Sequence, residues 1–443
     1  MSSKVDLLVL GATGVSGRQT TRYLAQPHGS SFTLAIAARS RKKLDDLVKE
    51  YSLPSTIQTW VVDVTDSQQV EQAVKNAKVV LNTVGPFYRW GTPVVRACAE
   101  NGVHYVDLTG EPYWVKEIID EYDQIATKTG AIIVPACGMD SLPSDISVYV
   151  ANKALKAASA LSASPLQIES SITSWHFDGL VSYGSFSTMM TALELVPKSM
   201  MNESRRPYYL SPVSGRLPPG PRLLYKLSIP NTLDTHIGGI FVMKNANQAI
   251  VERSWGIFEH NASTANVDNT QAYSEAKRLQ YGSRMVYDEF ATKKSAFAAI
   301  LASLGMLSMA LLAFRPIRWL AKRAGPQEGT GFSNGTLEKG KLKIVNVTKA
   351  EGPDIQAVVT LEGKGDPGYL LSPIMMADCA LTLLFDASSL SMIARRGGIL
   401  TPATAFGNVI VERMQKNPRF NWTCEVVRDG KVNGTVVEGR KDV

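Results

Sequence analysis

Val5-Asp-Leu-Leu-Val-Leu10 is followed at once by Gly11-Ala-Thr-Gly14-Val-Ser-Gly17 and then by a stretch of helical character. This order of apolar strand, glycine turn and helix decides how the first part of the chain folds. Gly11 suits a tight turn, Gly14 lets a ligand approach the backbone, and Gly17 lets the helix pack closely on the sheet. The start of such a helix presents unpaired N–H groups and a positive dipole end, so the turn predicts binding of a phosphate group.

Five more short apolar runs follow the first, separated by amphipathic stretches. Strands that alternate with helices in this way predict a parallel, doubly wound α/β sheet of the Rossmann type, which we assign to residues 1–145. The six predicted strands are Val5–Leu10, Thr33–Ala38, Gln58–Val62, Val79–Thr83, Val103–Leu108 and Ala131–Pro135.

The end of the second predicted strand indicates which dinucleotide would bind. NAD-dependent proteins usually place an acidic residue there to hold the ribose 2′-hydroxyl. This chain has Arg39-Ser40-Arg41-Lys42-Lys43 and no acid. We therefore predict NADP(H), with Arg39 pairing with the 2′-phosphate and Ser40 and Lys43 adding donors. The alternative is a solvated basic start to a helix.

Other cofactor contacts should come from loops at the carboxyl ends of the strands, where open α/β sheets bind their ligands. Besides Gly11, Gly14, Gly17, Arg39, Ser40 and Lys43, the predicted cofactor-binding residues are Ala12, Thr13, Val15, Asp63, Val64, Thr83, Val84, Gly85 and Pro86.

After about residue 145 the pattern changes. Residues 146–368 predict a second α+β domain with a mixed sheet. Residues 369–443 read as helices, which we expect to return to the first domain, and a hairpin at Trp422–Gly439 that turns at Asp429-Gly430. The predicted strands of the second domain are Ile168–Trp175, Gly239–Lys244, Ala249–Phe258, Lys341–Val347 and Ile355–Leu361.

Ala296–Phe314 stands apart because its 19 residues carry no charge, while lysines precede it and arginines follow it. Three structures compete for this segment: a buried helix of the second domain, a helix that dips into one leaflet of a membrane, or a transmembrane span. The basic flanks favour contact with an anionic membrane surface.

Several motifs occur in a fixed order along the chain: Gly11–Gly17, Thr83–Phe87, Tyr105–Glu111, Gly138–Asp145, Gly365–Tyr369 and Gly397–Ala403. Together they resemble the saccharopine dehydrogenase-like oxidoreductases, including the trans-acting enoyl reductases of bacterial lipid synthesis. The resemblance implies a Rossmann domain, a second α+β domain and a lipid-related activity. It also implies association with lipid droplets, as in animal members of the family.

The catalytic group cannot be named from the sequence, and Asp140 and Ser141 are the candidates we retain. Both follow the sixth predicted strand, and their alternative role is to cap the helix that begins there. Asp107, Glu111 and Asp145 lie in the same set of loops. The histidines lack the spacing of metal ligands, so we expect no metal site.

Composition excludes some classes of protein. Hydrophobic residues make up 44% and charged residues 20%, which is typical of globular proteins. The net charge of +7 comes without an arginine- or lysine-rich run interleaved with aromatic residues, so we expect no nucleic-acid partner. Four unclustered cysteines and no visible export signal predict an intracellular protein, in the cytoplasm or on the cytoplasmic face of membranes or lipid droplets.

The function predicted from these features is an NADPH-dependent oxidoreductase acting on a lipophilic small molecule. Two alternatives stay open. One is a non-catalytic membrane or lipid-droplet protein that keeps a Rossmann scaffold. The other is a soluble amino-acid dehydrogenase of the saccharopine type. The oligomeric state is also open, a homo-oligomer included.

Overall fold

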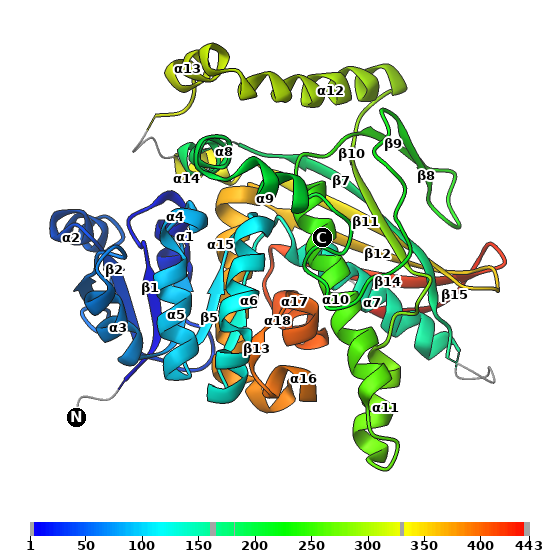
Figure 1. The fold of residues 1–443 in the computed structure, drawn as a ribbon, viewed down its shortest axis with the longest axis horizontal. Coiled ribbons are helices and arrows are strands. Elements are labelled where there is room, and N and C mark those ends of the chain that lie inside the picture. The colour runs from blue at the N-terminus through cyan, green and yellow to red at the C-terminus, as the bar shows by residue number, and fades with distance from the viewer. Residues whose placement is uncertain (1–3, 160–164, 181, 328–331, 438–443) are drawn as a thin grey trace.

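The structure is a computed structural model that describes residues 4–159, 165–180, 182–327 and 332–437. Its first sheet has seven parallel strands in the order β13-β6-β5-β4-β1-β2-β3, which is the doubly wound order with one strand added (Figure 1). The Rossmann prediction is confirmed. The strands are β1 (Val5–Leu10), β2 (Leu34–Ala38), β3 (Gln58–Val61), β4 (Ala77–Asn82), β5 (His104–Asp107), β6 (Ile132–Val134) and β13 (Gly398–Ile399).

Both faces of this sheet are buried, which explains why its strands are apolar runs without alternation. Leu7 and Val9 point into one core, whereas Leu8 and Leu10 point into the other. The helices of this part of the chain are α1 (Val15–Leu24), α2 (Arg41–Glu50), α3 (Ser67–Lys75), α4 (Phe87–Trp90), α5 (Thr92–Asn101) and α6 (Pro112–Thr129).

The second sheet has eight strands in the order β15-β14-β12-β11-β7-β10-β9-β8. Only β7 and β10 pair in parallel, so the predicted mixed sheet is confirmed. Helix α7 packs on β11, β12 and β14, and α10 packs on β10. The strands are β7 (Ile168–Asp178), β8 (Tyr225–Ser228), β9 (Thr235–Gly239), β10 (Val286–Thr292), β11 (Lys341–Ala350), β12 (Ile355–Lys364), β14 (Phe420–Arg428) and β15 (Lys431–Val437).

Two of the predicted strands were wrong. Ala249–Phe258 lies within the helix α10 (Lys244–Thr264), and β9 ends at Gly239, where Gly239–Lys244 was expected to begin a strand. Almost every residue of Ala249–Phe258 is buried, β-branched and charged residues alike. A helix that is buried all round has no apolar stripe, so its sequence loses the helical period.

The last 75 residues join both sheets. Helix α15 (Ser372–Phe385) packs on α1, β4 and β5, and β13 pairs with β6, so this part of the chain completes the first sheet. The predicted hairpin is β14–β15, with Asp429 and Gly430 at positive φ between the strands; residues 438 and 439 lie outside the described part.

The remaining helices connect these elements or lie at their ends. They are α7 (Leu142–Ala158), α8 (Tyr183–Leu195), α9 (Lys198–Glu203), α11 (Thr270–Leu279), α12 (Ala296–Ser308), a 3₁₀ turn (Met309–Ala313), α13 (Arg315–Ala324), α14 (Asn334–Leu337), a π turn (Pro367–Leu371), α16 (Met392–Arg395), α17 (Pro402–Ala405) and α18 (Asn408–Lys416), with a short 3₁₀ turn at Ala387–Ser389.

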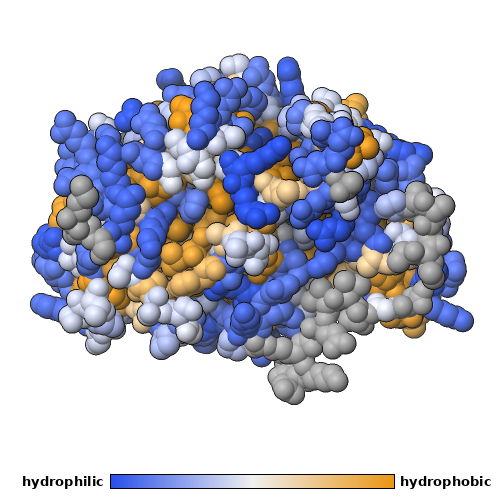
Figure 2. Space-filling model, turned by 90° about the horizontal axis from the view of Figure 1, so that it is seen from below, coloured by the Kyte–Doolittle hydropathy of each residue, from blue (hydrophilic) through white to orange (hydrophobic). Residues whose placement is uncertain are grey.

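The uncharged segment Ala296–Phe314 forms α12 and the 3₁₀ turn, at the edge of the molecule (Figure 1). Only Ala299 and Ser303 of α12 are buried, so of the three alternatives for this segment the buried helix of the second domain does not hold. The opposite face, seen from below in Figure 2, is largely hydrophilic with hydrophobic residues between the charged side chains. The core of the protein therefore does not cover the exposed apolar side chains of α12, and their exposure must have another reason.

Candidate functional site

The glycine turn between β1 and α1 has the geometry that its sequence predicts. Gly11 has a φ of +79°, and a Cβ placed on it would lie 2.7 Å from Thr83 Oγ1. A Cβ on Gly17 would lie 2.1 Å from the Gly11 carbonyl oxygen. Neither position accepts a side chain, so these two glycines keep β1, β4 and α1 in close contact.

Gly14 differs from the other two because it is exposed and only one atom lies close to the place of its Cβ. It is exposed, and the nearest atom to an added Cβ is the Gly11 carbonyl oxygen at 3.3 Å. It forms the N-cap of α1 without a side-chain cap and without an acid in the first turn. The N–H groups at the start of α1 therefore face outward, and this cradle fits the pyrophosphate of a dinucleotide.

The ends of β2 and β3 carry the residues predicted to select the dinucleotide. Arg39 is exposed at the end of β2, and Ser40 caps α2 by accepting the N–H of Lys43 at 3.4 Å. Asp63 accepts the N–H and the hydroxyl of Thr65 at 2.9 and 2.8 Å. These two bonds, and to a smaller extent the charge of Arg39, hold the pKa of Asp63 below its usual range. Arg39 and Asp63 thus lie near one another at this edge.

The loop after β4 is held in place by a carboxylate from the next strand's loop. Glu111 accepts the N–H groups of Phe87 and Tyr88 at 2.8 and 2.9 Å, at the start of α4. Thr83 donates its hydroxyl to the Leu10 carbonyl at 2.7 Å. Glu111 is buried, so it shapes the segment from Thr83 to Pro86 and does not face a ligand.

Asp107 has a similar structural role. It accepts the N–H groups of Thr109 and Ala136, both at 2.9 Å, and the hydroxyl of Tyr105 at 2.8 Å. Burial raises the pKa of Asp107 to about 7. Because its partners lie on β5 and in the loops after β5 and β6, it ties together the ends of two neighbouring strands. Asp145 likewise holds Ser254 and the N–H of Ala403, at 2.5 and 2.7 Å.

The two catalytic candidates, Asp140 and Ser141, differ in their hydrogen-bond partners. Ser141 is the N-cap residue of α7 but makes no side-chain cap; its hydroxyl donates to Asn247 Oδ1 at 3.2 Å. Asp140 makes no hydrogen bond within the described residues, and its Oδ2 lies 3.6 Å from the place of a Cβ on Gly110. Burial raises the pKa of Asp140 to about 6. Asp140 is thus a carboxyl held only by packing, beside the ends of β5 and β6.

Behind Ser141 lies a buried polar network of the second domain. Glu289 Oε2 accepts the Trp175 indole N–H at 2.9 Å and the hydroxyls of Ser144 and Tyr287 at 2.9 and 2.8 Å. Its Oε1 accepts the Asn247 amide at 2.9 Å. Burial raises the pKa of Glu289 to about 7. The network joins α7, α10, β7 and β10, so it sets the position of Ser141 relative to the second sheet.

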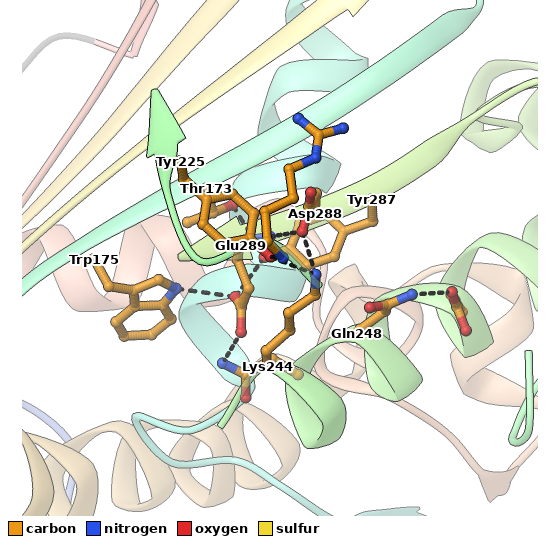
Figure 3. Close-up of polar contacts among 11 residues, drawn as sticks. Thr173, Trp175, Tyr225, Lys244, Gln248, Tyr287, Asp288 and Glu289 are labelled. Carbon is orange, nitrogen blue, oxygen red and sulfur yellow. Dashed lines mark hydrogen bonds and ion pairs between the residues drawn. The ribbon is translucent and has the colours of Figure 1, made fainter. Parts of the chain in front are cut away.

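Lys244 opens α10 next to this network. Its ammonium donates to Asp288 at 2.5 Å and to the Tyr225 hydroxyl at 3.3 Å (Figure 3). Burial alone would lower the pKa of Lys244, but the Asp288 carboxylate outweighs it and the pKa is raised. The preceding residue, Met243, reaches Gly110 with its terminal methyl group. The start of α10 thus forms the wall of the second domain that faces the strand ends of the first.

The chain is similar to known proteins. Residues 7–134 match the family model of the saccharopine dehydrogenase NADP binding domain. Over 431 residues the chain is 32% identical to the protein named "Putative trans-acting enoyl reductase Rv2449c" of Mycobacterium tuberculosis, covering 92% of this chain and 95% of that protein. The chain belongs to the saccharopine dehydrogenase-like oxidoreductases, the family of the trans-acting enoyl reductases. A trans-acting enoyl reductase of Mycobacterium bovis is 31% identical over 427 residues, with the same coverage.

Among solved structures, apo saccharopine dehydrogenase (L-Glu forming) from Saccharomyces cerevisiae aligns with 96% of this chain and 100% of its own, at 12% identity and a TM-score of 0.48. The family that the motifs predict is confirmed by the curated relatives. This saccharopine dehydrogenase-like protein accordingly has an NADP-binding domain of an oxidoreductase family at residues 7–134.

Some residues near the site were missed from the sequence. Met243, Asn247 and Glu289 come from the second domain, and the error in α10 hid the first two. The described residues contain no group of three or more histidine, cysteine or acidic side chains that could hold a metal ion.

Proposed function

We propose that this family member is an NADPH-dependent reductase of a lipophilic substrate and that it works at a lipid surface, either a membrane or a lipid droplet. The proposal rests on three features that occur together in this protein: an exposed glycine turn, a basic residue at the end of β2, and an exposed apolar helix. The first two features suit NADPH, and the third suits a partner of low polarity.

The preference for NADPH rests on Arg39. When bound, the dinucleotide supplies the hydride. Arg39 would hold the 2′-phosphate, for which a guanidinium is well suited. We expect Arg39→Asp to weaken NADPH binding by about 10- to 100-fold, the worth of a charge-assisted hydrogen bond, with little effect on NADH. Fluorescence titration with both nucleotides measures this, and equal affinities in the unmutated protein would refute the preference.

Gly14 and Gly17 provide a matched pair for the pyrophosphate site. Gly14→Val places its side chain where the ligand would lie and should leave the fold largely intact, because the one close atom, the Gly11 carbonyl oxygen at 3.3 Å, needs to move by only a few tenths of an ångström. Gly17→Val forces a side chain onto the Gly11 carbonyl and should unfold the domain. Thermal melts with and without NADPH test this. A Gly14→Val protein that NADPH still stabilises would place the site elsewhere.

We assign the proton donor of the reduction to Asp140. Reduction of a conjugated double bond adds a hydride to one carbon and a proton to its neighbour, so the chain must supply an acid. Asp140 is a carboxyl without a hydrogen-bond partner among the described residues, and its raised pKa of about 6 keeps part of it protonated at neutral pH. Ser141 is less suited because its proton is already donated to Asn247.

This assignment predicts a pH profile. The rate should fall as the pH rises through about 6, because only the protonated carboxyl can donate. Asp140→Asn should lower kcat by about 10²- to 10⁴-fold and remove that falling limb. The assay follows NADPH oxidation with a long-chain enoyl thioester. A variant that keeps both the rate and the limb would exclude Asp140 as the donor.

The lipid surface is supported by the exposed side chains of α12 and α13. Phe297, Leu301, Leu304, Phe314 and Trp319 are between 50% and 77% exposed, although all are large and apolar. Soluble proteins rarely expose such a contiguous row. We infer that these side chains insert into one leaflet and that α12 lies along the surface without crossing it.

The charges around α12 fit an anionic lipid surface. Six cationic residues and no acid lie between residues 293 and 324. Glu194 of α8 neutralises part of this charge by pairing with Arg318 and Lys322, at 3.3 and 2.7 Å. The remaining cations lie at both ends of the apolar row, where lipid phosphates would meet them.

A further inference from the structure

A cavity of about 470 Å³ lies between the C-terminal half of α1, helix α15 and helix α18. Its volume falls within the range of small-molecule sites. None of the predicted cofactor residues lines it, because it borders the opposite end of α1 from the glycine turn. The cavity therefore belongs neither to the dinucleotide cradle nor to the apolar surface of α12.

The wall of this cavity is basic. Four cationic side chains contribute to it: Arg22, Arg413, Lys416 and Arg419. Arg413 pairs with Asp386, and Arg419 makes two hydrogen bonds with Glu338, at 2.7 and 2.8 Å. In the described part of the chain, Arg22 and Lys416 form no ion pair, and the Glu338 carboxylate acts on Arg22 only from beyond ion-pair distance, so both charges can meet a ligand.

The floor of the cavity holds a polar atom without a partner. Asp378 is 1% exposed, and its Oδ1 accepts the Tyr23 hydroxyl at 2.8 Å. Its Oδ2 is buried and has no hydrogen-bond partner among the described residues. Asn417 donates to the Tyr23 hydroxyl at 3.3 Å and so fixes the pair. A buried carboxylate oxygen without a donor is costly, and a ligand hydroxyl at this point would satisfy it.

We propose that this cavity binds a small phosphate ester that carries a hydroxyl group. The phosphate would lie between Arg22 and Lys416, whose two charges match a dianion. The hydroxyl would donate to Asp378 Oδ2 in the ionised form of this carboxyl. Leu370 and Ile374 line the space between these points and accommodate the carbon atoms that connect them. A simple anion would leave the Asp378 oxygen unsatisfied, so both functional groups are required.

The test measures binding by calorimetry at pH 8, where Asp378 is largely ionised, in the presence of saturating NADPH, which occupies the dinucleotide site. The probes are glycerol 3-phosphate, inorganic phosphate and glycerol. We expect glycerol 3-phosphate to bind at least about tenfold more tightly than phosphate, and glycerol not to bind. A repeat without NADPH separates this proposal from the proposed function, since the cavity should bind the ester in either case.

Two variants test the assigned groups. Arg22→Ala/Lys416→Ala should weaken glycerol 3-phosphate binding at least about tenfold and leave NADPH affinity unchanged. The matched control is Lys198→Ala/Lys226→Ala, which removes the same charge from exposed positions elsewhere. Asp378→Asn keeps the acceptor for Tyr23 but should abolish the preference for the ester over phosphate. Equal weakening by the control, or no preference in the unmutated protein, would overturn the proposal.

Discussion

Two segments of the described chain are long and apolar enough to cross a membrane, and the fold treats them in opposite ways. Of Ala296–Ala313, which contains α12, 11% is buried. Of Pro367–Phe385, which contains α15, 83% is buried. Helix α15 lies against α1 and the first sheet, whereas α12 lies at the edge of the molecule (Figure 1). Length and apolar composition therefore show that a helix must be covered, but not what covers it.

The two segments differ more in the charge of their flanking residues than in their own apolar composition. Asp366 and Asp386 flank the segment of α15, and Asp378 lies inside it. Lysines 293 and 294 precede α12, and Arg315 follows the 3₁₀ turn. Acidic flanks oppose an anionic lipid surface and cationic flanks favour one. The flanking charge thus separates a core helix from a surface helix better than hydropathy does.

The largest effect should come from making α15 polar. Ile374, Met375, Leu381 and Leu383 are all at most 3% exposed. Each large-to-small change in a core costs about 2–5 kcal/mol, so four of them cost about 8–20 kcal/mol, as much as the whole 5–15 kcal/mol that stabilises a typical domain. We expect the fourfold serine variant to lack a folded state. Circular dichroism and a thermal melt measure this, and a cooperative melt near the unmutated temperature would contradict it.

The same change in the exposed segment should spare the fold and abolish lipid binding. Leu304, Leu307, Leu311 and Phe314 are at least 50% exposed, so replacing all four by serine should shift the melt little. Lipid binding should fall by roughly 6 kcal/mol, at about 1.5 kcal/mol or more for each inserted side chain. Flotation with vesicles containing phosphatidylserine measures this.

The outcomes of that experiment are distinct. If the unmutated protein does not float, the lipid-surface part of the proposed function is wrong. If the serine variant unfolds, α12 is covered by the protein itself, for example in an oligomer. Vesicles of phosphatidylcholine alone provide the control for charge, since they should bind the unmutated protein more weakly.

The parts of the fold that could be predicted are those with a regular burial pattern. The strands of the first sheet are buried on both faces and bounded by turns, so β1 to β6 were recognised within two residues or so. Helix α10 was misread because it is buried all round. Strand β10 was missed because Asp288 and Glu289 interrupt it, and their burial depends on partners distant in sequence, such as Lys244 and Trp175.

The candidate site also has parts that the sequence predicts and parts that it does not. The glycine turn of the proposed dinucleotide site is built from consecutive residues, so the sequence alone could predict it. Asp140 and Ser141 are adjacent and looked equivalent until the structure placed Asn247 beside only one of them. Which side chain has a partner depends on the packing of α10 against α7, and no local pattern encodes that contact.

A smaller effect should appear in the pH dependence of stability, and only in the buried segment. Burial raises the pKa of Asp378 in α15 from 3.8 to about 7. Between these values the folded protein holds a proton that the unfolded chain has released, so the free energy of unfolding falls as the pH rises and levels off above pH 7. Asp378→Asn cannot ionise and should remove this loss, on the order of 1–4 kcal/mol.

Denaturant titrations between pH 4.5 and 8 measure the difference. The variant should gain stability relative to the unmutated protein as the pH rises, because the Tyr23 hydroxyl keeps its acceptor. A constant difference across the range would show that Asp378 ionises as freely in the folded protein as in the unfolded chain. Segment 296–313 contains no ionisable side chain, so it contributes no such slope.

The smallest effect concerns the single glycine of α12. Gly305 is exposed in the last turn of this helix, and no atom of the described residues lies within 4 Å of a Cβ placed on it. Alanine there should stabilise the helix by about 0.5–1 kcal/mol. Because α12 contacts the body mainly through Ala299 and Ser303, it should open locally without unfolding the sheets, and the global melt should hardly move. Hydrogen exchange of the amides of α12 should therefore slow about two- to fivefold in Gly305→Ala, while exchange in α15 stays unchanged. Equal slowing in both helices would show that α12 and α15 unfold as one unit, and the contrast between an attached surface helix and a core helix would then be wrong.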